Sequence, residues 1–118
     1  MMIENFGVGI DLANVERFKQ KSFETNKKFY QKIFTDKEIM YCLKYKNRYE
    51  RFAGKFALKE ALIKSINQKI LFSKIETSHI KLKPVIKLLE VKEKYKFIAS
   101  LSHEKNYAVA IVISKKLT

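Results

Sequence analysis

The positions of apolar and polar residues divide this chain into a strand-like start, a helical middle and a strand-like end. Near the start, residues 6–12 are mostly apolar, which predicts a β-strand with Asp11 at its end. A short helix is predicted next, over residues 14–20. The strand contains Gly7 and Gly9, and glycine weakens a strand unless something comes close to its backbone. We therefore expect another backbone or a ligand to lie against this strand.

The middle of the chain carries the signals of two helices. Thr35 can cap the first helix, and Glu38 follows at the spacing of a capping box. The second helix is predicted over about residues 49–66. Gly54 within it costs roughly 1 kcal/mol relative to alanine, which indicates close packing. Asn67 follows the last apolar residue and can adopt the left-handed conformation that ends a helix.

The last third of the chain favours β-strands, because apolar residues alternate with polar ones after Ile75. The predicted strands cover residues 80–83, 85–89, 95–101 and 107–114. Pro84 interrupts the first two, and a polar turn over residues 102–106 joins the last two. One strand, then helices, then antiparallel strands predicts an α+β fold in which helices pack on a small antiparallel sheet. Because no linker is recognisable, we expect a single domain over residues 1–118.

Composition limits the class of protein and its compartment. Apolar residues make up 47% of the chain, which is enough for a modest core. Cys42 is the single cysteine, so no disulfide can form within the chain, and its helical surroundings favour a packing role. Residues 1–5 lack the regions of a signal peptide, and no apolar stretch approaches transmembrane length. We therefore expect a cytoplasmic protein without a membrane partner.

The formal net charge of +13 favours acidic partners such as nucleic acid, phosphorylated ligands, anionic membranes or an acidic protein. One interpretation is a basic nucleic-acid-binding module, because lysines are interleaved with tyrosines and phenylalanines. Against it, the lysines are spread along the chain, and no aromatic RNP run or Gly-x-x-Gly loop is present. A lysine-rich surface that serves solubility alone is the simplest alternative.

The most specific chemical signal lies in the second predicted helix. Glu60 and Lys64 are one turn apart, and Ala53 and Ala57 share their face. Two charged groups above a floor of methyl groups leave room for a large ligand against the helix, and they suit an anion or an anion with a metal. The plain alternative is an i,i+4 salt bridge worth roughly 0.2–0.5 kcal/mol.

Acidic and basic residues elsewhere can complete such a site. Asp11 and Glu60 can supply two oxygen ligands to Mg²⁺, which leaves positions for water and phosphate oxygens. The basic residues that can neutralise a ligand with several phosphates are Lys55, Lys59, Lys64 and His103. As structural alternatives, Asp11 can cap a helix, and His103 can be a solvated side chain in a turn.

Three segments of the chain form an ordered set of motifs. They are Gly7-Val8-Gly9-Ile10-Asp11-Leu12 with Arg17, Phe56-Ala57-Leu58-Lys59-Glu60-Ala61-Leu62-Ile63-Lys64, and Ser100-Leu101-Ser102-His103 with Tyr107-Ala108-Val109-Ala110. In this order and spacing they resemble the small bacterial holo-acyl-carrier-protein synthases, which are phosphopantetheinyl transferases. The helix start Phe34-Thr35-x-x-Glu38 is also similar to the family's. The middle segment is fairly specific by itself, and the three in order are highly specific.

The resemblance implies a homotrimer with active sites in clefts between neighbouring subunits. It implies an enzyme of fatty acid biosynthesis that transfers the 4′-phosphopantetheine group of coenzyme A to a serine of apo-acyl carrier protein. The reaction releases 3′,5′-ADP and requires Mg²⁺. Asp11 and Glu60 match the family's metal ligands, and Lys64 would neutralise the pyrophosphate. Glu60, or a water held at the metal site, would act as the base.

The resemblance also assigns residues to the two ends of the reaction. Lys55 and His103 match positions near the nucleotide end of coenzyme A. Arg17 matches an arginine that the family uses against its acidic carrier protein. The net charge of +13 would then speed the encounter with that carrier.

The chain departs from the family pattern at three places. The family's Gly-Lys-Pro reads Leu82-Lys83-Pro84 here, so we expect a changed loop around the nucleotide contacts of Lys83 and Pro84. Lys55 replaces an arginine, which keeps the charge but loses the bidentate fork and predicts weaker nucleotide binding. Asn67 stands where the family has a glycine-containing turn, and asparagine can adopt the same backbone.

Overall fold

The computed structural model describes residues 3–90 and 94–117 and has an α+β architecture, as predicted. The strands are β1 (Phe6–Asn14), β2 (Ile75–Ile80), β3 (Lys83–Leu88), β4 (Tyr95–Glu104) and β5 (Tyr107–Lys116). The helices are α1 (Val15–Lys19), α2 (Lys27–Ile33), α3 (Asp36–Leu43) and α4 (Arg48–Ile66), with short 3-10 turns η1 (Phe23–Thr25) and η2 (Phe72–Lys74). The stretch predicted not to be a signal peptide includes Met1 and Met2, which lie outside the described residues.

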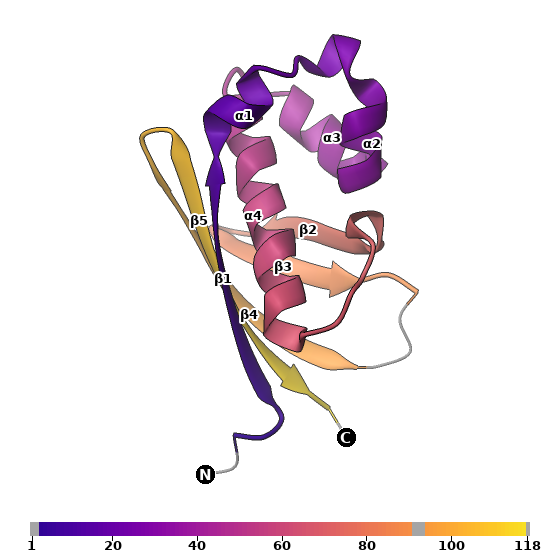
Figure 1. Ribbon diagram of the computed structural model, residues 1–118, viewed down its shortest axis with the longest axis vertical. Coiled ribbons are helices and arrows are strands. Elements are labelled where there is room, and N and C mark those ends of the chain that lie inside the picture. The colour runs from indigo at the N-terminus through magenta and orange to yellow at the C-terminus, as the bar shows by residue number, and fades with distance from the viewer. Residues whose placement is uncertain (1–2, 91–93, 118) are drawn as a thin grey trace.

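The strands form two antiparallel sheets, whereas one was predicted. β1, β5 and β4 form a three-stranded sheet in that order, and β2 pairs with β3 in a separate hairpin. Helix α4 lies across the three-stranded sheet (Figure 1). Helices α1, α2 and α3 gather around one end of α4. The β2–β3 hairpin lies on the side of α4 that faces away from β1. Helix α4 is therefore the central element that contacts both sheets.

The two glycines of β1 allow its backbone to touch the backbone of α4. A Cβ atom on Gly9 would lie 1.9 Å from the carbonyl oxygen of Ala61, and one on Gly7 would lie 1.7 Å from that of Ser65. The prediction of a close approach is confirmed, and the approaching group is the main chain of α4. This contact fixes where the end of β1 lies relative to the side chains of α4.

Local helix signals were reliable guides to the structure. Thr35 and Glu38 form the complete capping box at the start of α3, and Asn67 ends α4 in the left-handed conformation with a φ of 50°. Cys42 is fully buried, as a packing residue should be. Helix α2 was not predicted, and it forms around Tyr30, whose hydroxyl donates to the carbonyls of Phe18 and Lys21.

The strand boundaries differ from the prediction in several places. β1 continues to Asn14, so Asp11 lies within the strand and not at its end. The alternation over residues 80–83 is broken by a turn, because Lys81 adopts a left-handed φ of 58° and the chain reverses there. Pro84 lies inside β3, where a two-stranded sheet offers the edge position that proline needs. His103 lies within β4 and not in the following turn, because a left-handed Lys105 lets the hairpin reverse in two residues.

One face of the three-stranded sheet packs against α4, and the opposite face is open and apolar. Val8, Ile98 and Ile113 lie in one row across β1, β4 and β5, and Ile98 is 71% exposed. Ile10 and Leu12 extend this row along β1 and are also exposed. A contiguous apolar sheet face of this kind marks an interaction surface.

Over the described part of the chain, no helix is long and apolar enough to cross a membrane.

Candidate active site

Asp11, Glu60 and Lys64 meet where the end of β1 crosses α4. The Lys64 ammonium donates to Asp11 Oδ1 at 3.2 Å and to the carbonyl oxygen of Ile10 at 3.1 Å. This ion pair joins α4 to β1, so the i,i+4 alternative does not describe the role of Lys64. The capping alternative for Asp11 is also excluded, because Asn14 caps α1 by accepting from the Glu16 amide at 3.0 Å.

The two carboxylates of this site leave one oxygen atom without a hydrogen-bond partner. Burial raises the pKa of Glu60, and the nearby Asp11 raises it further, whereas Lys64 and Arg17 oppose the shift. The second oxygen of Asp11, Oδ2, is buried and has no hydrogen-bond partner. An unpartnered carboxylate oxygen beside a second carboxylate is a place where a cation is favourable.

This pair fits Mg²⁺. Magnesium is bound by one or two carboxylates and completes its octahedron with waters and substrate phosphates. Among the residues that the structure describes, no group of three or more His, Cys, Asp or Glu side chains gathers as a metal site. Two carboxylates on the rim of an open site match a metal that the substrate helps to hold.

The alanine floor of the predicted site is part of the protein core. Ala53 and Ala57 are completely buried, so no ligand lies against α4 there. The small residues of α4 allow other parts of the protein itself to pack closely, as at Ala61, where the backbone of Gly9 lies against the helix. The prediction of an open methyl surface was wrong, although its placement of Glu60 and Lys64 on one accessible face holds.

Lys59 is not available to a ligand, which corrects its assignment as a cofactor-binding residue. Its side chain is fully buried, and Nζ donates to Glu38 Oε1 at 2.6 Å. The carbonyl oxygens of Ile33 and Phe72 accept its other protons at 2.7 and 2.9 Å. Three acceptors satisfy an ammonium completely. Lys59 therefore joins α2, α3 and η2 to α4.

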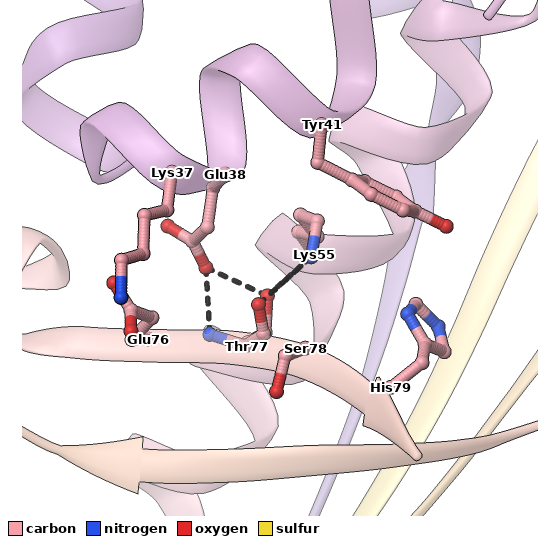
Figure 2. Close-up of a pocket in the computed structure, with 8 residues that line it drawn as sticks. All are labelled: Lys37, Glu38, Tyr41, Lys55, Glu76, Thr77, Ser78 and His79. Atoms are coloured by element: carbon pink, nitrogen blue, oxygen red, sulfur yellow. Dashed lines mark hydrogen bonds between the residues drawn. The ribbon is translucent and has the colours of Figure 1, made fainter. Parts of the chain in front are cut away.

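Lys55 is also buried, beside a cavity of about 230 Å³ between α3, α4 and β2. Its Nζ donates to the carbonyl and hydroxyl oxygens of Thr77 at 2.9 and 3.0 Å, and burial lowers its pKa. Figure 2 shows this arrangement, with Glu38 accepting from Thr77 and with Tyr41 and His79 on the opposite side. The lining residues are Lys37, Glu38, Tyr41, Lys55, Glu76, Thr77, Ser78 and His79.

The other predicted nucleotide contacts lie near this cavity. His103 Nε2 is 3.2 Å from the carbonyl oxygen of Glu50, and the imidazole packs on Gly54, next to Lys55 in α4. Pro84 pairs with His79, a lining residue of the cavity, and Lys83 precedes it on β3. Lys83 and Pro84 thus lie on the β2–β3 hairpin beside the cavity, whereas His103 lies on β4 of the three-stranded sheet and contacts α4 at Gly54.

The two groups of predicted site residues lie on different faces of α4. Lys55 and Lys59 form one i,i+4 stripe and contact Thr77 and Glu38. Glu60 and Lys64 form another stripe, directed to β1. A single chain thus does not bring the metal pair and the nucleotide contacts into one cleft.

Two further features were missed by sequence reasoning. Glu38 was recognised as a capping residue, but nothing local reveals that it is fully buried and bound to Lys59 and Thr77. An apolar groove of about 390 Å³ also lies beside α4. Ile63, one turn after Glu60, forms one of its walls, and the remaining lining is Lys32, Lys69, Ile70, Leu71 and Phe72.

Arg17 lies on α1 beside the metal pair. Its guanidinium lies 5.3 Å from the centre of the Phe56 ring, and it is close enough to Glu60 to lower that residue's pKa. The arginine is exposed, so its charge is presented at the entrance to the site.

Comparison with known proteins decides which family has this arrangement. The sequence model of the 4′-phosphopantetheinyl transferase superfamily matches residues 7–112. The chain belongs to this superfamily. Its similarity extends over whole chains: it is 38% identical to the holo-[acyl-carrier-protein] synthase of Thermodesulfovibrio yellowstonii over 115 residues, 95% of this chain and 98% of that protein. The proposed metal pair, Asp11 and Glu60, thus lies within the matched phosphopantetheinyl transferase region.

Solved structures of phosphopantetheinyl transferases share the fold. The holo-[acyl-carrier-protein] synthase of Helicobacter pylori, solved in complex with coenzyme A, has a TM-score of 0.78 at 30% identity and covers 92% of this chain and 99% of its own. That of Neisseria meningitidis has a TM-score of 0.81 at 23% identity, with coverage of 93% and 98%. Membership of a transferase family gives no support to the alternative of a nucleic-acid-binding module.

Proposed function

We propose that this protein is a holo-[acyl-carrier-protein] synthase, acting as a single domain in the cytoplasm. The serine hydroxyl of apo-acyl carrier protein attacks the β-phosphorus of coenzyme A, the bond from that phosphorus to the bridging oxygen breaks, and 3′,5′-ADP leaves. The observation that carries the proposal is the Asp11–Glu60–Lys64 cluster, with its unpartnered carboxylate oxygen, in a chain of this family.

The residues of the cluster have distinct roles in this proposal. Asp11 and Glu60 would hold Mg²⁺, which when bound supplies positive charge to the pyrophosphate of coenzyme A. Lys64 neutralises the pyrophosphate and the departing ADP. Glu60, or a water held at the metal site, would accept the proton of the serine hydroxyl.

The nucleotide and pantetheine ends of coenzyme A have separate places. Four residues are proposed to receive the nucleotide: Lys55 of α4, Lys83 and Pro84 of the β2–β3 hairpin, and His103 of β4 beside Gly54. The groove along Ile63 and Phe72 is proposed to receive the pantetheine arm, because it is apolar and begins one turn from Glu60. Arg17 at the entrance would contact the acidic carrier protein.

A homotrimer can bring together the proposed metal pair and the proposed nucleotide contacts, which lie apart within one chain. In a ring of copies, the metal pair of one subunit can face the nucleotide contacts of its neighbour, which forms a cleft between subunits. The open apolar face of the three-stranded sheet supports this assembly, because it would otherwise expose Val8, Ile10 and Ile98 to water.

The assembly can be tested by placing a charge on that face. Ile98→Asp is expected to convert trimer to monomer, because a carboxylate cannot be buried without a partner. Multi-angle light scattering after size-exclusion chromatography gives the mass. Met40→Asp, which charges an equally exposed apolar residue on α3, should leave the trimer intact. A monomeric wild-type protein, or a trimeric Ile98→Asp variant, would contradict the assignment of this face.

The activity is tested by mixing the protein with coenzyme A, Mg²⁺ and apo-acyl carrier protein. The carrier should gain the mass of one phosphopantetheine group, and chelation of the metal should stop the gain. A carrier of unchanged mass at millimolar-scale Mg²⁺ would exclude this function. An inactive relative is distinguished by heat denaturation, because coenzyme A with Mg²⁺ raises the midpoint only if the folded protein binds them.

A further inference from the structure

The Lys64 ammonium stands at Asp11, one of the two carboxylates proposed to hold the metal. It is 3.2 Å from Asp11 Oδ1, and the other oxygen of that carboxylate is buried without a partner. Lys64 also donates to the carbonyl oxygen of Ile10, so two acceptors on β1 hold it in place. A divalent cation bound to Asp11 would therefore lie within a few ångströms of an ammonium.

The two partners of this ion pair differ in their freedom to move. The Asp11 side chain is 14% exposed, whereas that of Lys64 is 54% exposed and ends a flexible four-carbon stem. Asp11 is fixed by β1, but Lys64 can turn toward solvent or a ligand without disturbing the core. Lys59, with three buried acceptors, has no such freedom.

The charges around the Lys64–Asp11 ion pair determine how a bound cation would affect it. The carboxylates of Asp11 and Glu60 face the ammonium of Lys64 and the guanidinium of Arg17, so the site is balanced before any ligand arrives. A divalent cation added to a balanced site meets repulsion from Lys64, and the repulsion is relieved if the ammonium moves to a new anion. The pyrophosphate of coenzyme A is such an anion.

We propose that Lys64 is an exchangeable counter-ion: it holds Asp11 in the free protein and moves to the pyrophosphate when the metal takes its place. Only the identity of this anion rests on the proposed function. Metal and coenzyme A then bind cooperatively, because each favours the same displaced position of Lys64, and the coupling is reciprocal. This arrangement keeps the affinity for free metal low until the substrate is present.

The test measures Mn²⁺ binding to the full-length protein by electron paramagnetic resonance, without carrier protein. Lys64→Gln is expected to bind Mn²⁺ alone about tenfold more tightly than wild type, because the competing charge is gone. Lys46→Gln is the matched control: it removes the same charge from an exposed lysine before α4, outside the site, and its effect should be at most about twofold. Lys64→Met provides a second variant, and circular dichroism verifies that each folds.

The same titration with coenzyme A present measures the coupling. Coenzyme A should tighten Mn²⁺ binding about tenfold more in wild type than in Lys64→Gln, because phosphate ligation of the metal persists in the variant and only the part that comes from moving Lys64 is lost. Unchanged or weaker Mn²⁺ binding by both Lys64 variants would overturn the proposal, as would equal tightening in Lys46→Gln. These readouts need no transfer, so failure of phosphopantetheine transfer by the wild type contradicts the proposed function and not this exchange.

Discussion

Glu60→Gln is expected to lower the rate of phosphopantetheine transfer by about 10³-fold or more, because a neutral amide is a poor metal ligand and cannot accept the serine proton. The same change should leave thermal stability equal to or higher than that of wild type. Burial and Asp11 both disfavour the charged form of Glu60 in the folded protein, as its raised pKa indicates. Single-turnover assays and thermal denaturation measure the two effects.

The matched control for this variant is Glu50→Gln, which makes the same chemical change near the start of α4. It should transfer at close to the wild-type rate. Light scattering should find the same assembly for Glu60→Gln as for wild type. A Glu60→Gln enzyme with near-normal rates would show that the metal pair has been assigned wrongly.

Lys59→Met should be the most destabilising single change among the lysines of α4. It leaves the buried Glu38 carboxylate without its cation and removes the ammonium donor from the carbonyl oxygens of Ile33 and Phe72. The Phe72 carbonyl keeps its bond from the Ile75 amide. Removing one partner of a buried ion pair costs about 3–5 kcal/mol, a large part of the roughly 5–15 kcal/mol that stabilises a typical domain. Denaturant unfolding at fixed protein concentration measures the loss.

The partner of Lys59 supplies an internal check on this value. The double variant Lys59→Met, Glu38→Gln should be more stable than Lys59→Met alone, because the carboxylate charge is gone and the amide oxygen can still accept a hydrogen bond from Thr77. Lys46→Met, an exposed lysine before α4, should change the free energy of unfolding by at most about 0.5 kcal/mol. If Lys59→Met unfolds within that same margin of wild type, the ammonium is not needed for the fold.

Features set by neighbouring residues could be predicted from the sequence. The capping box of Thr35 and Glu38 and the left-handed Asn67 depend on a few adjacent positions, so their signals are local. The glycines of β1 correctly predicted a close approach, although they did not show that the backbone of α4 is the approaching group. The left-handed Lys81 was missed because that conformation is usually marked by glycine or asparagine.

Features that depend on distant contacts could not be read from the pattern. Lys59 was expected at a ligand because lysine is rarely buried, and only the approach of Glu38, Ile33 and Phe72 reveals its internal role. The meeting of Asp11 with Glu60 was a hypothesis from residue chemistry that the family resemblance strengthened, because spacing along the chain does not give it. Lys55, a predicted nucleotide contact, lies on a different face of α4 from Glu60 and Lys64. A motif written as a linear sequence does not show this separation.

The glycine contact between β1 and α4 has a consequence for how this site can change. Gly7 and Gly9 meet carbonyl oxygens of α4 directly, so no side chain can be enlarged or trimmed there to adjust the spacing between strand and helix. Any chemistry that needs a wider gap between the two acidic ligands must therefore come from exchanging the ligands themselves. The backbone contact keeps the distance between β1 and α4 constant, so only the side chains that these two elements carry can vary.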